Sequence, residues 1–302
     1  MKIYKLLWES KKRFLPILFL CCFNYMVTGQ VSQIERHVLL DLYNNTNGEK
    51  WTDTWDLEKP VSEWYGITVK DGHVVAIALF KNNLVGNLPE RIGELKHLIA
   101  LNLAFNSLSG ELPNSLTRLY KLRSLKLEMN RLRGTLPIAI GDLKSLKELT
   151  VFNNFLSGEI PTSLGKITNL KILNLSSNNF KGEIPDTLGQ LENLEVLGLF
   201  ENSLDGFIPA EIGNLLKLKE LVLANNQLNG AVPKALGQLA SLQIFQIQNN
   251  HFNSIENLDH MRSEQFLVFD YDNKDTGMKF KKIDAAKTRM ADTEFEDDEH
   301  DN

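Results

Sequence analysis

Cysteine is almost absent from this chain of 302 residues. Both cysteines, Cys21 and Cys22, lie within the first 29 residues. If that segment is removed, the remaining chain has no thiol, which excludes disulfide bonds, zinc clusters built on cysteine and thiol catalysis. A lipid anchor on Cys21 is disfavoured, because Leu20 stands where such a signal has a small residue.

Long hydrophobic runs are also missing. The apolar run from Phe14 to Phe23 is too short to cross a bilayer comfortably, since about 20 residues are needed. It follows a front that contains five Lys or Arg residues, and it precedes small residues that end at Gly29. We therefore predict a signal peptide over residues 1–29 and a secreted or cell-envelope protein, with an uncleaved anchor as the alternative.

Positive charge is in deficit. The formal net charge is -5, and removing five basic residues and one acidic residue with the first 29 residues takes it to -9. A polyanionic partner would be repelled by such a chain. We therefore expect no binding to nucleic acid or to an anionic membrane surface.

What the chain does have is a repeat of 24 residues, marked by asparagine. Each of the first seven marker asparagines is followed by a glycine four residues later and by a proline seven residues later. Seven of the nine prolines obey this rule. The marker asparagines are Asn82, Asn106, Asn130, Asn154, Asn178, Asn202, Asn226 and Asn250.

The residues before each asparagine follow Leu-x-x-Leu-x-Leu-x-x-Asn, which is the signature of a leucine-rich repeat solenoid. Leu149 and Val151, five and three residues before Asn154, face inward from one side of a short strand. Pairs such as Leu164 and Ile167 are expected to close each coil on the convex side. The predicted fold class is an α/β solenoid, a superhelix with a parallel β-sheet on the concave face and short helical or 3-10 turns on the convex face.

The marker asparagines are predicted to form a structural ladder. Each lies in the turn after a strand, where its amide can bond backbone groups that lack a partner in the sheet. Stacking of the coils aligns these amides. Removing one should cost about 1–3 kcal/mol, because the groups it served would be buried without partners.

These repeats resemble the plant-type class of leucine-rich repeat. Residues 178–194, NNFKGEIPDTLGQLENL, carry its pattern most closely. The class is found in plant receptor ectodomains, in plant inhibitor proteins and in secreted bacterial proteins. The resemblance covers roughly two thirds of the chain, and it implies that partners bind on the concave face or on an adjacent flank.

A non-repeating N-terminal cap is predicted over residues 30–72. It begins with apolar residues at helical spacing from Ile34 to Tyr43. Large aromatic residues follow, and we expect them to cover the open end of the solenoid rather than to form a platform for sugars. These aromatic residues are Trp51, Trp55, Trp64 and Tyr65.

The cap also resembles that of the plant-type proteins, but without its disulfide. Trp64 and Gly66 keep the pattern, whereas Ser62 and Val69 stand where the plant-type cap has cysteines. This departure favours a resemblance to secreted bacterial leucine-rich repeat proteins, whose caps read like residues 42–51.

The repeats are predicted over residues 73–250, with a C-terminal capping repeat over 251–273. A last strand is expected there, behind a helix near residues 255–262, because bulky aromatic residues keep the 24-residue spacing up to Tyr271. Residues 274–302 are predicted to be a flexible acidic tail, since seven acidic residues lie between Asp292 and Asp301.

The candidate binding site is the concave face, at the two positions before each marker asparagine. Strands about 4.8 Å apart would place apolar side chains on neighbouring coils as an exposed band. The alternative is that these rings only shield the sheet. The candidate partner-binding residues are Phe80, Phe105, Lys126, Glu128, Met129, Phe152 and Phe200.

The second half of the same face is expected to be polar, with residues such as Asn174, Ser176 and Gln248. Its amides and hydroxyls suit a sugar chain or an extended peptide, and they also suit an idle soluble face. On a flank, Glu111 and Glu159 belong to a column that we expect to be solvated charge.

We find no pattern for catalysis. The six histidines share no common position in the repeats, so we expect no metal site and no base beside a nucleophile. In DYDNKDTG, Lys274 stands where a calcium loop needs an oxygen ligand.

The expected function is a non-enzymatic, monomeric recognition module outside the cytoplasm, with no cofactor and with a protein or peptide partner. The alternatives are a glycan-binding or hydrolase-inhibiting protein and a structural or adhesive surface protein.

Overall fold

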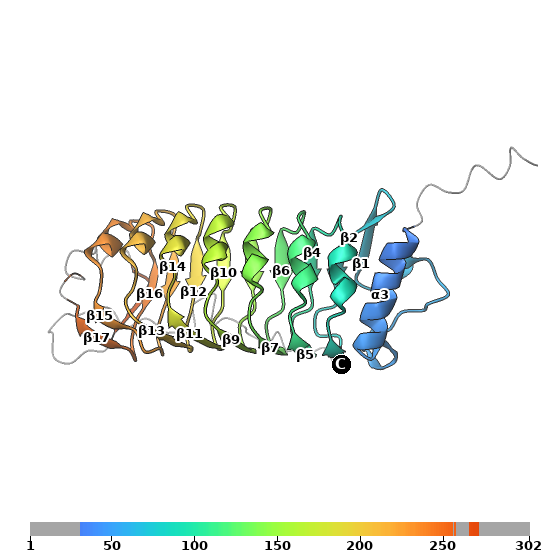
Figure 1. Ribbon diagram of the computed structural model, residues 1–302, viewed down its shortest axis with the longest axis horizontal. Helices are drawn as coiled ribbons and strands as arrows, with labels where there is room; N and C mark the ends of the chain where they lie inside the picture. Colours follow the sequence, from blue (N-terminus) through green and yellow to red (C-terminus); the bar gives the residue numbers. More distant parts are fainter. Residues whose placement is uncertain (1–30, 256, 258–265, 272–302) are drawn as a thin grey trace, which may run out of the picture.

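The computed structural model of the protein describes residues 31–255, 257 and 266–271. The expected signal peptide over residues 1–29 and the expected acidic tail over 274–302 lie outside the described residues, as does most of the helix expected near residues 255–262. The described chain is an elongated solenoid, with a helix at one end and a stack of coils that runs to the other (Figure 1).

The main sheet has ten strands and follows the 24-residue repeat. Neighbouring coils pair in parallel with a constant register, so that Leu149, Leu173 and Leu197 lie side by side. Its strands are β1 (Ile67–Lys70), β2 (His73–Ala78), β4 (Ala100–Asn102), β6 (Ser124–Lys126), β8 (Glu148–Thr150), β10 (Ile172–Asn174), β12 (Val196–Gly198), β14 (Glu220–Val222), β16 (Ile244–Gln246) and β18 (Val268–Asp270).

A second sheet was not anticipated from the sequence. It forms just after the marker asparagines, where the repeat glycines adopt positive φ. Its six strands are β3 (Val85–Asn87), β5 (Ser107–Glu111), β7 (Arg131–Gly134), β9 (Phe155–Gly158), β11 (Asn179–Glu183) and β13 (Ser203–Asp205). A separate pair, β15 (Asn229–Ala231) and β17 (His251–Ser254), continues the pattern.

Short 3-10 helices form the convex side. Each begins directly after a repeat proline, which sits at the N-cap with its ring-fixed φ. Leu164 and Ile167 close one such coil and are fully buried. The helices are η4 (Glu90–Glu94), η5 (Asn114–Arg118), η6 (Ile138–Asp142), η7 (Thr162–Lys166), η8 (Asp186–Gln190), η9 (Ala210–Asn214) and η10 (Lys234–Gln238). The predicted fold class is confirmed.

The N-terminal end is covered by helix α3 (Gln33–Asn45), with Ser32 as its N-cap. The Ser32 hydroxyl accepts a hydrogen bond from the Glu35 backbone N–H. Val38, Leu39 and Leu42 are buried, as their spacing predicts, but Ile34 is exposed. In the first turn of α3 the buried side chain is that of Glu35.

The rest of the cap packs around aromatic rings. It contains η2 (Gly48–Lys50), η3 (Val61–Glu63) and β1 (Ile67–Lys70), which pairs antiparallel with β2. Trp55 stacks on Trp64 with ring centroids 4.7 Å apart, and it also stacks with Tyr43 at a centroid distance of 5.9 Å. Trp51, Trp55 and Trp64 are all buried. Rings covered in this way cannot serve as a platform for sugars, whereas Tyr65 remains exposed.

The marker asparagines bond to the backbone of adjacent coils. The Asn154 amide donates to the carbonyls of Leu127 and Val151, both at 3.0 Å, and its Oδ1 accepts from the Leu132 N–H at 2.9 Å. Asn130 and Asn178 make the equivalent bonds. Each asparagine therefore satisfies groups at the turn where the chain leaves the main sheet.

Candidate functional site: the concave face

The concave side chains come from the main sheet and from the two residues before each marker asparagine. The second of these residues adopts a left-handed backbone in every coil, with φ of 57° at Phe105 and 54° at Met129. Its N–H still donates to the next coil, as from Phe105 to the Glu128 carbonyl at 2.9 Å. The candidate side chains therefore project from backbone that the stacking of coils holds in place.

The structure places the apolar candidates on successive coils, but covers them more than the sequence suggested. The rings of Phe80 and Phe105 contact each other with centroids 5.0 Å apart. Phe80 is 48 % exposed. Phe105, Met129 and Phe152 are only partly exposed. The expected exposed band is thus a partly shielded ridge whose open end is Phe80.

The two charged candidates differ from each other. Lys126 is partly exposed and pairs with Glu148 at 2.9 Å. Glu128 is only 9 % exposed, so the expectation that it is a surface neighbour of the apolar band is wrong. Its carboxylate accepts a hydrogen bond from the Thr150 hydroxyl. Burial raises the pKa of Glu128 above its ordinary value, although the bond from Thr150 opposes that change.

The second half of the face has the expected polar side chains at its surface, with Gln246 and Gln248 partly exposed and Asn249 exposed, but it also contains an apolar cluster that the sequence did not suggest. Val222, Ile244 and Val268 form a small apolar cluster there, and Phe200 packs against it. These valine and isoleucine residues occupy outward positions of β14, β16 and β18, which the analysis of the two residues before each asparagine did not include. Phe200 therefore belongs to this second cluster and not to the ridge at Phe80.

Polar atoms within this second half lack internal partners. Ser176 Oγ and Gln248 Oε1 are buried and have no hydrogen bond among the described residues. Both belong to the column that also contains Phe200, two residues before the marker asparagines. A buried polar atom without a partner is costly, so these two atoms are candidate hydrogen-bonding groups for a ligand.

Basic residues line one edge of the main sheet, a feature that the sequence analysis missed. Arg123, Lys147 and Lys171 are exposed and stand 24 residues apart, directly before their strands. Further along this column, Glu195 pairs with Lys171 at 3.2 Å and with Lys219 at 2.7 Å. The periodicity of the charges was the available signal, and the overall acidic composition concealed it.

The flank formed by the second sheet carries a hollow of about 600 Å³. Its lining includes Glu159, Glu183 and Asp186, together with Phe207, whose ring is 63 % exposed. The glutamate column expected to be solvated therefore borders a concavity in this region. The hollow is open and acidic, in contrast to the basic edge of the concave face.

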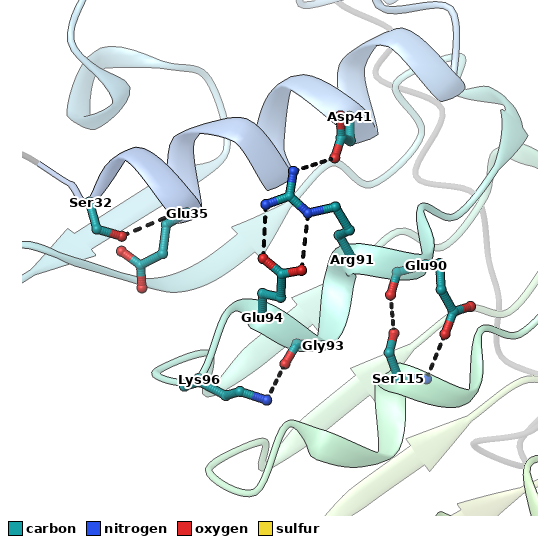
Figure 2. Close-up of polar contacts among 9 residues, drawn as sticks. All are labelled: Ser32, Glu35, Asp41, Glu90, Arg91, Gly93, Glu94, Lys96 and Ser115. Carbon is teal, nitrogen blue, oxygen red and sulfur yellow. Dashed lines mark hydrogen bonds and ion pairs between the residues drawn. The ribbon is translucent and has the colours of Figure 1, made fainter.

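A further cluster joins the cap to the first coils. His73 and His97 differ by 24 residues, so the expectation that no histidines share a repeat position is wrong for this pair. Their rings stack with centroids 3.6 Å apart, beside the buried carboxylate of Glu35. Burial lowers the pKa of His97, the charges of His73 and Lys121 lower it further, and Glu35 opposes them. Figure 2 shows Glu35 in the first turn of α3, and it shows Arg91 paired with Asp41 and with Glu94.

Two family descriptions match the repeats by sequence. A leucine-rich repeat region matches residues 79–181, and individual leucine-rich repeats match residues 193–215 and 217–239. The chain is a leucine-rich repeat protein. None of the curated proteins matches this leucine-rich repeat protein significantly.

Solved structures of plant receptors resemble it. The complex of PEPR1 with AtPEP1 is 31% identical, with a TM-score of 0.70, over 78% of this chain and 34% of that one. The Arabidopsis receptor kinase HAESA, in complex with the peptide hormone IDA and the co-receptor SERK1, is 28% identical, with a TM-score of 0.63, over 73% and 42%. The plant peptide hormone receptor RGFR1, in complex with RGF2, is 36% identical, with a TM-score of 0.57, over 58% and 28%.

The leucine-rich repeat protein thus spans less than half the length of these receptor chains. It shares with them the repeated coil and the curved sheet. Within the described residues, no helix is both long enough and apolar enough to span a membrane.

Proposed function

We propose that this leucine-rich repeat protein is a non-enzymatic recognition module that acts outside the cytoplasm and binds a peptide or protein on its concave face. The observation that carries the proposal is the mixed chemistry of that face. The ridge at Phe80 and Phe105, the apolar cluster at Phe200 and the basic edge at Arg123 and Lys147 lie on one curved sheet.

The ligand that fits this surface is an extended chain with apolar anchors and acidic groups. The two apolar regions are separated along the sheet, and an extended peptide can reach both while its carboxylates face the basic edge. Buried apolar anchors supply most of the energy in such interfaces, and charge complementarity guides orientation and association. The likeness to HAESA, solved with the peptide hormone IDA, and to the peptide hormone receptor RGFR1, solved with RGF2, supports this class of ligand.

Action outside the cytoplasm rests on the pattern of residues 1–29. A basic front, an apolar run and small residues are typical of a secretory signal peptide. N-terminal sequencing of the protein recovered from the medium or the cell envelope tests this part. Cleavage after Gly29 is the expected result, and an intact N-terminus would favour a retained anchor.

The binding proposal is tested with a double variant, Phe105→Ser with Met129→Ser, and a control variant, Phe207→Ser. The wild-type protein and both variants capture partners from the native extracellular fraction, and the captured peptide or protein is then identified and titrated against each. We expect the double variant to bind the identified partner at least tenfold more weakly, since it loses two apolar contacts of about 1 kcal/mol or more each. Phe207→Ser removes an exposed ring from the flank and should leave affinity unchanged.

Other outcomes contradict the proposal in different ways. Equal capture by wild type and double variant would remove the ridge from the binding site. Loss of binding in Phe207→Ser alone would place the site on the acidic flank. Capture of a polysaccharide or of a polysaccharide hydrolase would favour the glycan-binding or inhibitory alternative.

A further inference from the structure

Glu35 is a carboxylate buried at the junction of the cap and the first two coils. It is 4 % exposed, and its Oε2 has no hydrogen-bond partner among the described residues. Burial of an ionised carboxylate costs several kcal/mol unless a cation or several donors compensate it. Arg91 does not compensate the charge of Glu35, because its guanidinium pairs with Asp41 and with Glu94 instead (Figure 2).

The groups that do face Glu35 are two histidines from successive coils. Its Oε1 lies 3.4 Å from His73 Nδ1 and 3.8 Å from His97 Nδ1. Potential ligand atoms of all three residues lie within 4.8 Å of one another. Three potential metal ligands, one on α3, one on β2 and one in the turn before β4, therefore lie close together at the junction of the cap and the repeats.

These distances suit a small metal ion. Zn²⁺ binds histidine nitrogen and carboxylate oxygen at about 2.0–2.2 Å, so tetrahedral ligands stand roughly 3.3–3.6 Å from each other. The distances from Glu35 to the two histidines are close to that range. Each imidazole must also turn its ring plane toward the metal, since the two rings are now nearly parallel at 20°. Both side chains are more than a third exposed and have room to turn.

We propose that Glu35, His73 and His97 form a binding site for a divalent transition metal. Two imidazoles and one carboxylate suit Zn²⁺ or its neighbours in the first row, whereas Mg²⁺ and Ca²⁺ prefer oxygen ligands. The bound ion would neutralise the buried carboxylate of Glu35. The positive charge of Lys121, which acts on His97, would weaken the binding of a cation. Three protein ligands leave a fourth position for water or for a group from a partner.

Such an ion would fasten the cap to the repeats. Helix α3 contributes Glu35, and the first two coils contribute one histidine each, so the ion links three segments in one centre. The only cysteines of the chain are Cys21 and Cys22, so no disulfide can form within residues 30–72 to hold the cap together. A metal bridge would therefore restrain this end of the solenoid by different chemistry.

The test is a calorimetric titration of the full chain with ZnCl₂ in a buffer that does not bind metals. We expect wild type to bind one equivalent that is weakened at least tenfold by His73→Asn, by His97→Asn and by Glu35→Gln. His37→Asn is the matched control, because His37 is exposed on the same helix and outside the cluster. Cys21 and Cys22 are unchanged in all variants, so any zinc bound there cancels in the comparison.

Further measurements distinguish loss of metal binding from loss of folding. Circular dichroism of each variant without metal must match wild type, and Co²⁺ should give wild type the visible absorption of a four-coordinate ion. Zinc should raise the Tm of wild type and of His37→Asn, but not that of His97→Asn. The proposal is overturned if wild type binds no more zinc than Glu35→Gln does, or if folded His73→Asn and His97→Asn bind zinc as wild type does.

Discussion

The marker asparagines act at the scale of single residues, because each one bonds backbone groups of two adjacent coils at once. Asn154 donates to a carbonyl of its own coil, donates to a carbonyl of the preceding coil and accepts from the N–H that follows the preceding turn. Its side chain is 5 % exposed, so water does not replace these bonds when the amide is removed. The asparagine is therefore required by hydrogen bonding and not by packing volume.

Replacing Asn154 with alanine should lower the free energy of unfolding by about 1–3 kcal/mol, because buried backbone groups lose their partners. Urea denaturation followed by circular dichroism measures the change. The control is Asn179→Ala, at an exposed position of β11. A loss in the control as large as that in Asn154→Ala would mean that the ladder has no special role.

The residue before each marker asparagine has a left-handed backbone, which β-branched side chains tolerate poorly. At Glu201 φ is 52°. We expect Glu201→Val to be less stable than Glu201→Gly by about 1–2 kcal/mol, since both lose the bond from Ser177 and only valine strains the backbone. Equal unfolding midpoints in urea would contradict this reading of the turn.

Glu128 should make the protein less stable as pH rises. Burial raises its pKa in the folded state, so the folded state holds more protons than the unfolded state between the two pKa values. Its contribution is therefore most favourable below the unfolded value of about 4.3 and falls as pH rises through the folded value. We expect Glu128→Gln to match wild type in acid and to exceed it in stability at neutral pH. Urea midpoints at the two pH values check the sign, and a variant less stable than wild type at neutral pH would refute it.

At the scale of elements, backbone contacts between neighbouring segments leave little room for side chains. Gly66 lies just before β1, with φ of 72°, and a Cβ built on it would lie 2.1 Å from the Ala78 carbonyl oxygen. Its own carbonyl accepts from the Ala78 N–H at 2.7 Å. The hairpin of β1 and β2 thus depends on the absence of a side chain there.

Gly66→Ala should destabilise the cap by about 1–3 kcal/mol, because both the backbone conformation and the close contact oppose the methyl group. Hydrogen exchange by mass spectrometry should show the loss first in β1 and β2, with the later coils protected as before. Ser62→Ala, at an exposed cap residue, serves as the control. Unchanged exchange in β1 would contradict the prediction.

Elements of the main sheet could be predicted from sequence because one rule repeats in every coil. The 24-residue spacing determines which residues pair, and the structure shows that register from β2 to β18. The second sheet could not be predicted in the same way. Its strands are short, and they pair through backbone groups in the segment after each marker asparagine. In that segment the sequence offers only a glycine and one buried leucine as a sign of a strand.

At the scale of the whole molecule, each coil contacts mainly its neighbours, so coils behave as exchangeable units. Deleting residues 155–178, one complete period, should leave a folded and somewhat less stable protein, because Asn154 then joins Asn179 in register. Deleting residues 155–166, half a period, should unfold the chain from that point. Cooperative thermal melting followed by circular dichroism distinguishes the two, and similar behaviour of both deletions would contradict the modular description.

The candidate site was less accessible to sequence reasoning than the fold. Phe105 and Met129 could be assigned to the concave face by phase, but their exposure depends on neighbouring coils that the phase does not describe. Glu128 looked like a surface charge and is buried. The cluster of Glu35, His73 and His97 combines residues far apart in sequence, and only the docking of α3 brings the carboxylate to the histidine pair.

The constant period also has a mechanical consequence. Helix α3 and strand β18 lie at opposite ends of the stack, so a pull between the two ends acts across the coils in series. A coil that gives way releases 24 residues, which extend by about 80 Å, while its neighbours remain intact. Under tension the molecule would therefore lengthen in equal steps, one coil at a time.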